Sequence, residues 1–478
     1  MAAFKHGVYT SEQSTSLATS VPVESGITFA VGTAPVYMTD GNVNKVIYTQ
    51  SLKEAVEALG NSSDFETFTL CEVINTHYTL YGVSPVVFVN VFDPTKHKSA
   101  VTEAEYPLID GRVELSESAI IGSVVVKATA GGTALVSGTD YNAFYANEHL
   151  VIEKIDGGAV TGTSVFVEYD KADISKVTKA DIIGGVDVNT GEKSGLELIS
   201  TVYSKYGIVP ELIIAPGFSD DPAVAAIMAT KAGAINGIFK GKALIDADCK
   251  TVKKYSDVFA WKSDNNINDK NQIVCWPAVA LGGVKYHLSA QLAALMASVD
   301  GDNDGIPSES PSNKALKADS TVLADSTEIV LEQDEANVLN GKGIATAINS
   351  GGRFVFWGNE TACYPVNTDV KDYFICINRM FGYEAKRLQL QYASFVDKKL
   401  LPRMIDTIVD SENIALGSLV SGEHILGGRI EYRSEDNPVT NLMAGILVFH
   451  IYIAPASPAK EIDFTLEYDV NYVSAALS

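Results

Sequence analysis

The pattern of hydrophobic and polar positions changes character several times along the chain. Residues 1–25 are rich in Ser and Thr and show no helical period, which predicts an extended arm. In residues 26–106, short apolar runs alternate with amphipathic helical patterns, which is typical of an α/β layer. Ser51 and Glu54 have the spacing of a capping box, so we expect a helix to begin there. The run 86–91 is apolar throughout and predicts a central parallel strand.

Residues 107–178 carry a different pattern, with short β-branched runs, Gly-Gly turns and no helical period. After this block the α/β alternation resumes, with a further helix expected near 334–348. A β-rich block inside a continuing α/β pattern indicates an insertion. We therefore expect a multidomain α/β protein, in which a small all-β domain interrupts an α/β domain made of 26–106 and 179–358.

The last third of the chain is mainly helical and then β-rich. Helices are expected near 372–382, 384–401 and 403–419, and strands follow them. We expect residues 359–460 to form a C-terminal α+β domain and residues 461–478 to form a C-terminal strand and arm.

The segment 461–470 has the cleanest pattern in the sequence. Apolar and mostly acidic residues alternate without a fault, which predicts a strand with one buried face and one acidic face. Five apolar side chains, at roughly 1.5–3 kcal/mol each, are too many to leave in water. The strand is expected to pair with its own sheet, 446–453 being the nearest candidate, or with the sheet of a neighbour. Its apolar residues are Ile462, Phe464, Leu466, Tyr468 and Val470.

Composition excludes several classes of protein. The 478 residues include 36 Lys and Arg, 59 Asp and Glu, and 46% hydrophobic residues, which is enough apolar material for about three packed domains. The net charge of −23 repels phosphate, so we expect neither direct nucleic-acid binding nor an anionic membrane as a partner. The apolar run 445–455 is too short to span a bilayer, and the N-terminus has no apolar signal core. We expect the five scattered cysteines to be buried free thiols.

Motifs for enzymatic chemistry are absent from the sequence. It contains no H-E-x-x-H, G-x-S-x-G, G-x-G-x-x-G or phosphate-binding loop, and its seven His residues are scattered. We therefore expect neither catalytic residues nor a cofactor.

A short acidic run is the candidate metal site. Asp300, Asp302 and Asp304, followed by a Gly, match the start of a D-x-D-x-D-G calcium loop. The bidentate Glu of such a loop is replaced by Pro311, and Glu309 comes two positions too early. A solvated turn accounts for the same residues, so we expect no metal here.

The stretch 371–403 is basic within an acidic chain, with seven Lys and Arg residues and three Asp and Glu residues. It fits either a solvated helical face or a docking surface for an acidic partner, since complementary charge fixes register. The candidate contact residues are Lys371, Arg379, Lys386, Arg387, Lys398, Lys399 and Arg403.

Five short segments, in their order and spacing, resemble contractile tail sheath proteins of phages and phage-like particles. They lie at both ends and in the middle of the chain. They are His-Gly-Val-Tyr-Thr-Ser-Glu at 6–12, Ser-Gly-Ile-Thr-Phe-Ala-Val-Gly-Thr-Ala-Pro at 25–35, Leu-Asn-Gly-Lys-Gly-Ile-Ala at 339–345, Gly-Arg-Phe-Val-Phe-Trp-Gly at 352–358 and Pro-Ala-Lys-Glu-Ile-Asp-Phe at 458–464.

The resemblance implies a structural subunit of the virion tail, assembled in the cytoplasm of a bacterial host. Such subunits stack as hexameric rings around an inner tail tube and also meet baseplate and terminator proteins. Their C-terminal domain faces the tube, their inserted domains lie outside, and their terminal arms complete the sheets of neighbours. Contraction is rigid-body rearrangement of subunits.

Two other classes of protein compete with this interpretation. A calcium-stabilised surface or secreted β-rich binding protein would use the Asp300 loop and the β-rich block. An α/β enzyme with an inserted domain would need a convergent polar site, which the sequence does not reveal.

Overall fold

The computed structural model describes residues 24–39, 41–115 and 118–477, and a mixed sheet of eight strands forms its centre. The strands lie in the order β19-β18-β14-β13-β12-β1-β3-β2. The inner strands run parallel, whereas β2 and β19 at the edges run antiparallel to their neighbours. In chain order they are β1 (Thr28–Gly32), β2 (Ile47–Thr49), β3 (Val86–Asn90), β12 (Leu212–Ile214), β13 (Lys242–Asp246), β14 (Gln272–Cys275), β18 (Ile344–Ser350) and β19 (Arg353–Trp357).

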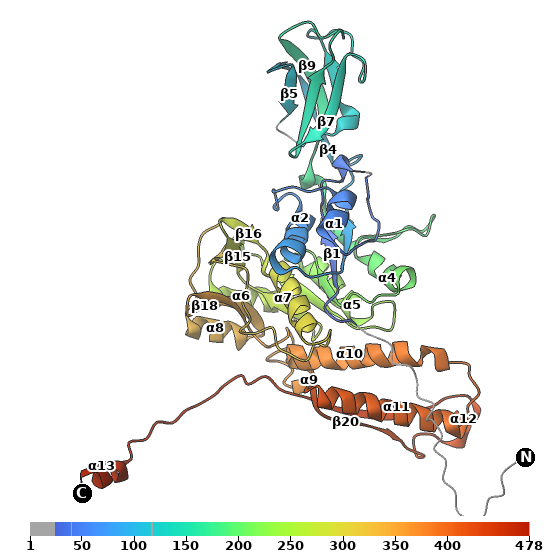
Figure 1. Cartoon of the computed structure of the whole chain (residues 1–478), viewed down its shortest axis with the longest axis vertical. Helices are drawn as coiled ribbons and strands as arrows, with labels where there is room; N and C mark the ends of the chain where they lie inside the picture. Colours follow the sequence, from blue (N-terminus) through green and yellow to red (C-terminus); the bar gives the residue numbers. More distant parts are fainter. Residues whose placement is uncertain (1–23, 40, 116–117, 478) are drawn as a thin grey trace, which may run out of the picture.

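Helices cover this sheet because its central strands are apolar on both faces. Every residue of β1, β3, β12 and β13 is buried, so neither face is left to water. Figure 1 shows the resulting α/β layer, which confirms the predicted mixed α/β fold. Its helices are α1 (Leu52–Leu59), α2 (Thr69–Ile74), α3 (Lys179–Ile183), α4 (Ile199–Tyr206), α5 (Pro222–Gly233), α6 (Tyr255–Asp264), α7 (Leu288–Asp302) and α8 (Gln333–Asn340).

Ser51 caps α1 as predicted, but only half of the predicted capping box forms, because Glu54 accepts from the residue before the cap. The Ser51 hydroxyl accepts a hydrogen bond from the N–H of Glu54 at 3.4 Å, and the Glu54 carboxylate accepts one from the N–H of Gln50 at 2.8 Å. Two small antiparallel sheets complete the layer. Their strands are β10 (Gly185–Val186) with β11 (Lys193–Ser194), and β15 (Ala278–Leu281) with β16 (Val284–Tyr286) and β17 (Ser320–Val322).

Residues 98–172 form a β-rich block with an apolar core of its own, which includes Leu115 and Val167. Its two sheets have the orders β4-β9-β6 and β5-β8-β7. The β-rich pattern expected from residue 107 starts earlier, because β4 already pairs with β9. Figure 1 shows the block projecting beyond α1 and α2. Its strands are β4 (Lys98–Pro107), β5 (Arg112–Leu115), β6 (Val125–Lys127), β7 (Tyr141–Ala146), β8 (His149–Lys154) and β9 (Ser164–Ala172).

A second layer lies on the opposite side of the α/β layer from the β-rich block (Figure 1). It contains α10, α11 and a hairpin, which share a core with Met380, Tyr383, Leu416 and Leu419. From residue 456 the chain leaves this layer as an extension that ends in a short helix. The elements are α9 (Val370–Tyr373), α10 (Ile375–Tyr392), α11 (Pro402–Ser421), β20 (Ile425–Tyr432), α12 (Val439–Met443), β21 (Phe449–Pro455) and α13 (Val470–Leu477).

Three helices predicted in this half of the chain are wrong in their bounds. The helices expected near 372–382 and 384–401 are replaced by a single long helix, α10, because Gly382 lies inside it without ending it. An internal Gly weakens a helix by only about 1 kcal/mol, which tertiary packing overcomes. The helix expected near 334–348 ends at Asn340, and the residues that follow form β18 beside β14.

All five cysteines are unpaired, as predicted, and all but Cys249 are buried. No helix in the three described ranges has both the length and the apolarity needed to cross a bilayer. Of the predicted N-terminal arm, residues 1–23 lie outside the described residues.

Candidate functional site

The hairpin of β20 and β21 forms a two-stranded antiparallel sheet, with Tyr432 opposite Phe449. One face of the hairpin packs on α11. Within the described ranges, no third strand pairs with either of its edges. The side chain of Leu426 on β20 is 74% exposed. Because an unpaired edge presents free N–H and C=O groups, this sheet has the geometry to accept a further strand.

The strand predicted over 461–470 is not present within the chain. Residues 461–469 are extended but pair with no other described segment, and Val470 begins α13. The predicted partner segment does not receive them either, since β21 pairs with β20 alone among the described residues. The alternating apolar side chains therefore stand in solvent. Their exposed fractions are 68% for Ile462, 86% for Phe464, 95% for Leu466, 80% for Tyr468 and 65% for Val470.

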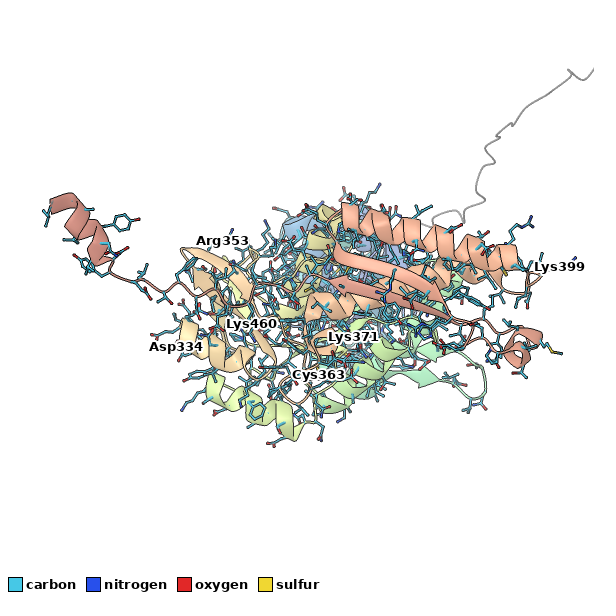
Figure 2. All side chains as sticks on the ribbon, turned by 90° about the horizontal axis from the view of Figure 1, so that it is seen from below. Asp334, Arg353, Cys363, Lys371, Lys399 and Lys460 are labelled. Carbon is cyan, nitrogen blue, oxygen red and sulfur yellow. The ribbon has the colours of Figure 1, made fainter. Side chains whose placement is uncertain are left out.

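An ion pair fixes the root of this C-terminal extension. Lys460 Nζ lies 2.6 Å from Oε1 of Glu360, a residue that is only 2% exposed. The same ammonium stands over the ring of Tyr364, 5.3 Å from its centroid. Partial burial opposes the charge, but Glu360 outweighs it and raises the pKa of Lys460. The extension thus stays attached up to Lys460, which Figure 2 shows against the body of the molecule.

The structure divides the predicted basic docking surface into a buried part and an exposed part. Arg379, Lys386 and Arg387 are 4%, 2% and 7% exposed on the inner face of α10. They cannot meet a partner in this conformation. The prediction is wrong for these three residues because α10 directs them toward buried carboxylates of the same chain.

Glu211, which precedes β12, is the carboxylate that two of these cations enclose. Arg379 Nη2 donates to Glu211 Oε1 at 2.8 Å, and Lys386 Nζ donates to Oε2 at 3.2 Å. Arg379 also donates through both Nη atoms to Asp300. Burial alone would raise the pKa of Glu211, but Lys386 and Arg379 lower it to about 2. Among the described residues, Asp300 forms an ion pair with Arg379 only, and burial raises the pKa of Asp300.

The same ion network holds the start of the described chain. The N–H of Gly26 donates to Glu211 Oε1 at 3.0 Å, and the Ser25 hydroxyl donates to Asp300 Oδ2 at 3.0 Å. Lys386 Nζ donates to the carbonyl oxygen of Glu24 at 2.7 Å. The N-terminal segment, the central sheet, α7 and α10 therefore meet at one buried point.

Arg387 joins α10 to α11. Its Nε donates to Glu384 Oε2 at 3.0 Å, and its Nη2 forms an ion pair with Glu412 on α11. The hydroxyl of Tyr392 donates to the second oxygen of Glu412 at 2.9 Å. Because the carboxylate of Glu412 is fully buried and paired on both oxygens, the two helices are fixed in register.

The candidate calcium loop does not form. Asp300 and Asp302 lie in the last turn of α7, so they do not converge as alternate loop ligands do. The carboxylate of Asp300 is occupied by Arg379. No group of three or more His, Cys, Asp or Glu residues that could hold a metal ion occurs in the described part of the chain. Asp304 follows the helix in the left-handed conformation, with φ of 57°.

The remaining cations of the basic stretch are accessible. Lys371 Nζ lies 2.7 Å from Asp372, so its charge is partly compensated. Lys398, Lys399 and Arg403 are exposed around the turn that joins α10 to α11. Figure 2 shows Lys399 at the end of the helical layer. The exposed cations of the basic stretch therefore gather at this turn.

The sequence pattern did not reveal the three buried carboxylates of these ion pairs, namely Glu211, Glu360 and Glu412. A local signal did exist for their partners, since Arg379 and Lys386 are seven residues apart on the helix face that also carries Tyr383. No local signal identifies the carboxylates, because each one comes from a distant part of the chain.

Comparison with known proteins identifies relatives along the whole chain. No protein-family model matches the sequence. It is 29% identical, over an alignment of 490 residues covering 98% of both chains, to the tail sheath protein of Burkholderia phage BcepMu. It is 25% identical over 320 residues, 66% of this chain and 78% of the relative, to a putative prophage major tail sheath protein of Pseudomonas aeruginosa strain UCBPP-PA14.

Solved structures share the fold at low sequence identity. The sheath of the PVC extracellular contractile injection system, in its contracted state, superposes with a TM-score of 0.56 at 13% identity and covers 99% of both chains. The crystal structure of the sheath tail protein from Desulfitobacterium hafniense superposes with a TM-score of 0.52 at 13% identity, over 90% of this chain and 94% of that one. The sequence similarity and the shared fold thus both extend over nearly the whole chain, including the open β20–β21 hairpin and the unpaired extension. Along nearly its whole length the chain is similar to a phage tail sheath protein, and it shares the fold of the sheath proteins of contractile injection systems.

Proposed function

We propose that this chain polymerises as stacked hexameric rings around an inner tail tube and drives the tube through a target envelope on contraction. The observation that carries the proposal is the C-terminal extension, whose apolar face has no partner among the described residues. Solved structures with this fold come from contracted sheaths and from a baseplate, which supports the same assembly here. Contraction is then a rigid-body rearrangement between two packings of subunits.

The extension is proposed to add a strand to the β20–β21 sheet of a neighbouring subunit. An extended chain spans about 3.3 Å per residue, so residues 461–469 reach roughly 30 Å beyond Lys460. Pairing would bury apolar side chains at roughly 1.5–3 kcal/mol each and would satisfy an open sheet edge. The N-terminal arm, residues 1–25, is proposed to join the same sheet.

The domain organisation is proposed from the same contacts. Residues 26–106, apart from β4, and residues 179–358 form the α/β body, and residues 359–460 form the inner domain that faces the tube. The inserted β-domain, residues 107–178 together with β4, is proposed to lie on the outside, which its position at the end of the molecule opposite α10 and α11 supports (Figure 1). Residues 1–25 and 461–478 are the arms, which act as hinges. Copies of this chain, the tube protein, and the baseplate and terminator proteins are the proposed partners.

The proposed particle is a phage tail or a phage-like contractile device, assembled in the cytoplasm of a bacterial host. No nucleotide is needed in this scheme, because the free energy of contraction is stored in the extended assembly.

Electron microscopy of the purified chain tests the proposed assembly. We expect the full chain to form tubes or hexameric rings, and a chain lacking residues 1–22 to remain in small species with an unchanged melting temperature. The unchanged melting temperature is expected because the described anchor residues Glu24, Ser25 and Gly26 are retained. A monodisperse small oligomer from the full chain, or normal tubes from the shortened one, would contradict the proposal.

The exposed turn between α10 and α11 is the proposed contact with the acidic partner, the inner tube or a neighbouring copy. Replacing Lys398 and Lys399 with Glu should weaken tube-bound assembly, most strongly below about 0.1 M salt, where exposed charges are least screened. A variant with Lys53 and Lys254, both exposed elsewhere, changed to Glu has the same net charge and should assemble normally. If both variants co-sediment with tubes equally well, the turn between α10 and α11 is not a contact with the acidic partner.

A further inference from the structure

A cavity of about 260 Å³ lies where the α/β layer meets α10. The segments that precede β13 and β14, α9 and the middle of α10 line it. It gathers an unusual number of cations for a chain of net charge −23. They are Lys240, Lys242, Lys270, Lys371 and Arg379, and the acidic residues of the lining are Glu211 and Asp372.

We call this space the basic cavity. Each of the two carboxylates in its lining already forms ion pairs with two cations. Glu211 is enclosed by Arg379 and by Lys386, which lies outside the lining. Asp372 accepts from Lys270 at 3.0 Å and from Lys371 at 2.7 Å. The positive charge of the lining is therefore in excess.

Lys242 at the start of β13 lacks a paired carboxylate although it is only 4% exposed. Its ammonium donates to the carbonyl oxygen of Lys270 at 3.3 Å, to Asn271 Oδ1 at 3.1 Å and to Asn378 Oδ1, all of them neutral acceptors. Nearby, the buried Nε of Arg379 donates to no acceptor in the described part of the chain. A buried ammonium without a counter-charge is costly, and an anion in the cavity would remove that cost.

We propose that the basic cavity binds one oxyanion, a carboxylate or a phosphate-like group. Its volume is below the roughly 300–1,000 Å³ of sites for drug-sized ligands, so it suits a single small anion or one acidic side chain. The anion would sit among charge-assisted donors, with lysines as point charges. Two sources supply this chemistry, a free ion or an Asp or Glu of a second copy. The site does not depend on the proposed function.

The titration of Lys242 gives the site a pH dependence. Burial first, and then the charge of Arg379, lower the pKa of Lys242 to about 7, while Asp269 and Glu211 act in the opposite direction. Lys270 faces it with a further positive charge. An anion prefers the protonated ammonium, so affinity should be highest below pH 7 and should fall as the pH rises.

Equilibrium dialysis of the full chain against radiolabelled sulfate, whose charge is constant over this range, tests the proposal. We expect saturable uptake of one sulfate per chain at pH 6 and weaker binding at pH 8.5. Lys240→Gln and Lys270→Gln should each weaken binding by about fivefold, since each removes one charged donor. The exposed Lys53→Gln, which lies outside the cavity, should bind as the unmodified chain does.

Lys242→Met should bind sulfate several-fold more weakly and lose the pH dependence. If Lys242→Met fails to fold, Lys240→Gln and Lys270→Gln still test the site. Absence of saturable uptake, or equal affinity in Lys270→Gln and Lys53→Gln, would overturn the site. Two further measurements distinguish the sources, and both outcomes support the site. If sulfate slows the assembly of the unmodified chain but not of Lys270→Gln, a carboxylate of a second copy is the occupant. If sulfate binds without affecting assembly, a free ion is the occupant.

Discussion

Changing Phe464 and Leu466 to Ser should abolish tube formation while leaving the melting temperature of the free chain unchanged. Both side chains are at least 86% exposed in the single chain, so their loss removes no packing there. In an assembled sheet, burial of each side chain would contribute roughly 1.5–3 kcal/mol to the free energy of every subunit contact. Losing two such contributions raises the concentration needed for assembly by about 10²–10⁴. Sedimentation at increasing concentration measures that change directly.

The opposite face of the same segment provides the matched control. Asp463 and Glu467 alternate with the apolar residues, so changing both to Ser keeps the segment's length and alters only its acidic face. This control should assemble within a few-fold of the normal concentration. If the Phe464 and Leu466 variant assembles as readily as the control, the apolar face of the extension is not at a subunit contact.

The extension also shows where sequence patterns are informative and where they stop. The alternation over 461–470 predicts a strand, because period 2 reflects the pleat. Within the single chain the segment pairs with no described strand, so pairing with a neighbouring subunit stays a prediction. By contrast, the start of α1 at Ser51 and the apolar run that contains β3 were predicted correctly, because cap and strand signals are local.

The basic stretch 371–403 is a case in which the sequence pattern led to a wrong expectation of exposure. Net charge over 371–403 indicated a surface, yet Arg379 and Lys386 are among the least exposed charges of the chain. Charge density along the sequence does not distinguish the faces of a helix, whereas the 3.6-residue period does. Their partner Glu211 lies more than 160 residues away along the chain, so only the fold brings the pair together.

The buried pairs of Glu211 should contribute strongly to stability. In Glu211→Gln the side chain keeps its shape but no longer carries the charge that Lys386 and Arg379 enclose. A pKa lowered from 4.5 to about 2 in a fully buried group corresponds to about 3 kcal/mol, which agrees with the roughly 3–5 kcal/mol for breaking a buried ion pair. Urea unfolding should show that loss. Glu57→Gln, which removes an exposed pair with Lys53, should cost less than about 0.5 kcal/mol.

The pH dependence separates this charge effect from a simple packing defect. Because the pKa of Glu211 is depressed in the folded chain, its stabilisation is complete above about pH 4.5 and disappears as the pH falls toward 2. The difference in unfolding free energy between the unmodified chain and Glu211→Gln should therefore be constant from pH 7 to 5 and should shrink below pH 4.5. A difference that stays the same down to pH 3 would mean that the substitution disturbs packing or the hydrogen bond from Gly26, and that the ion network contributes little. A difference that shrinks as expected would show that charge at this one carboxylate ties the N-terminal segment and α10 to the central sheet.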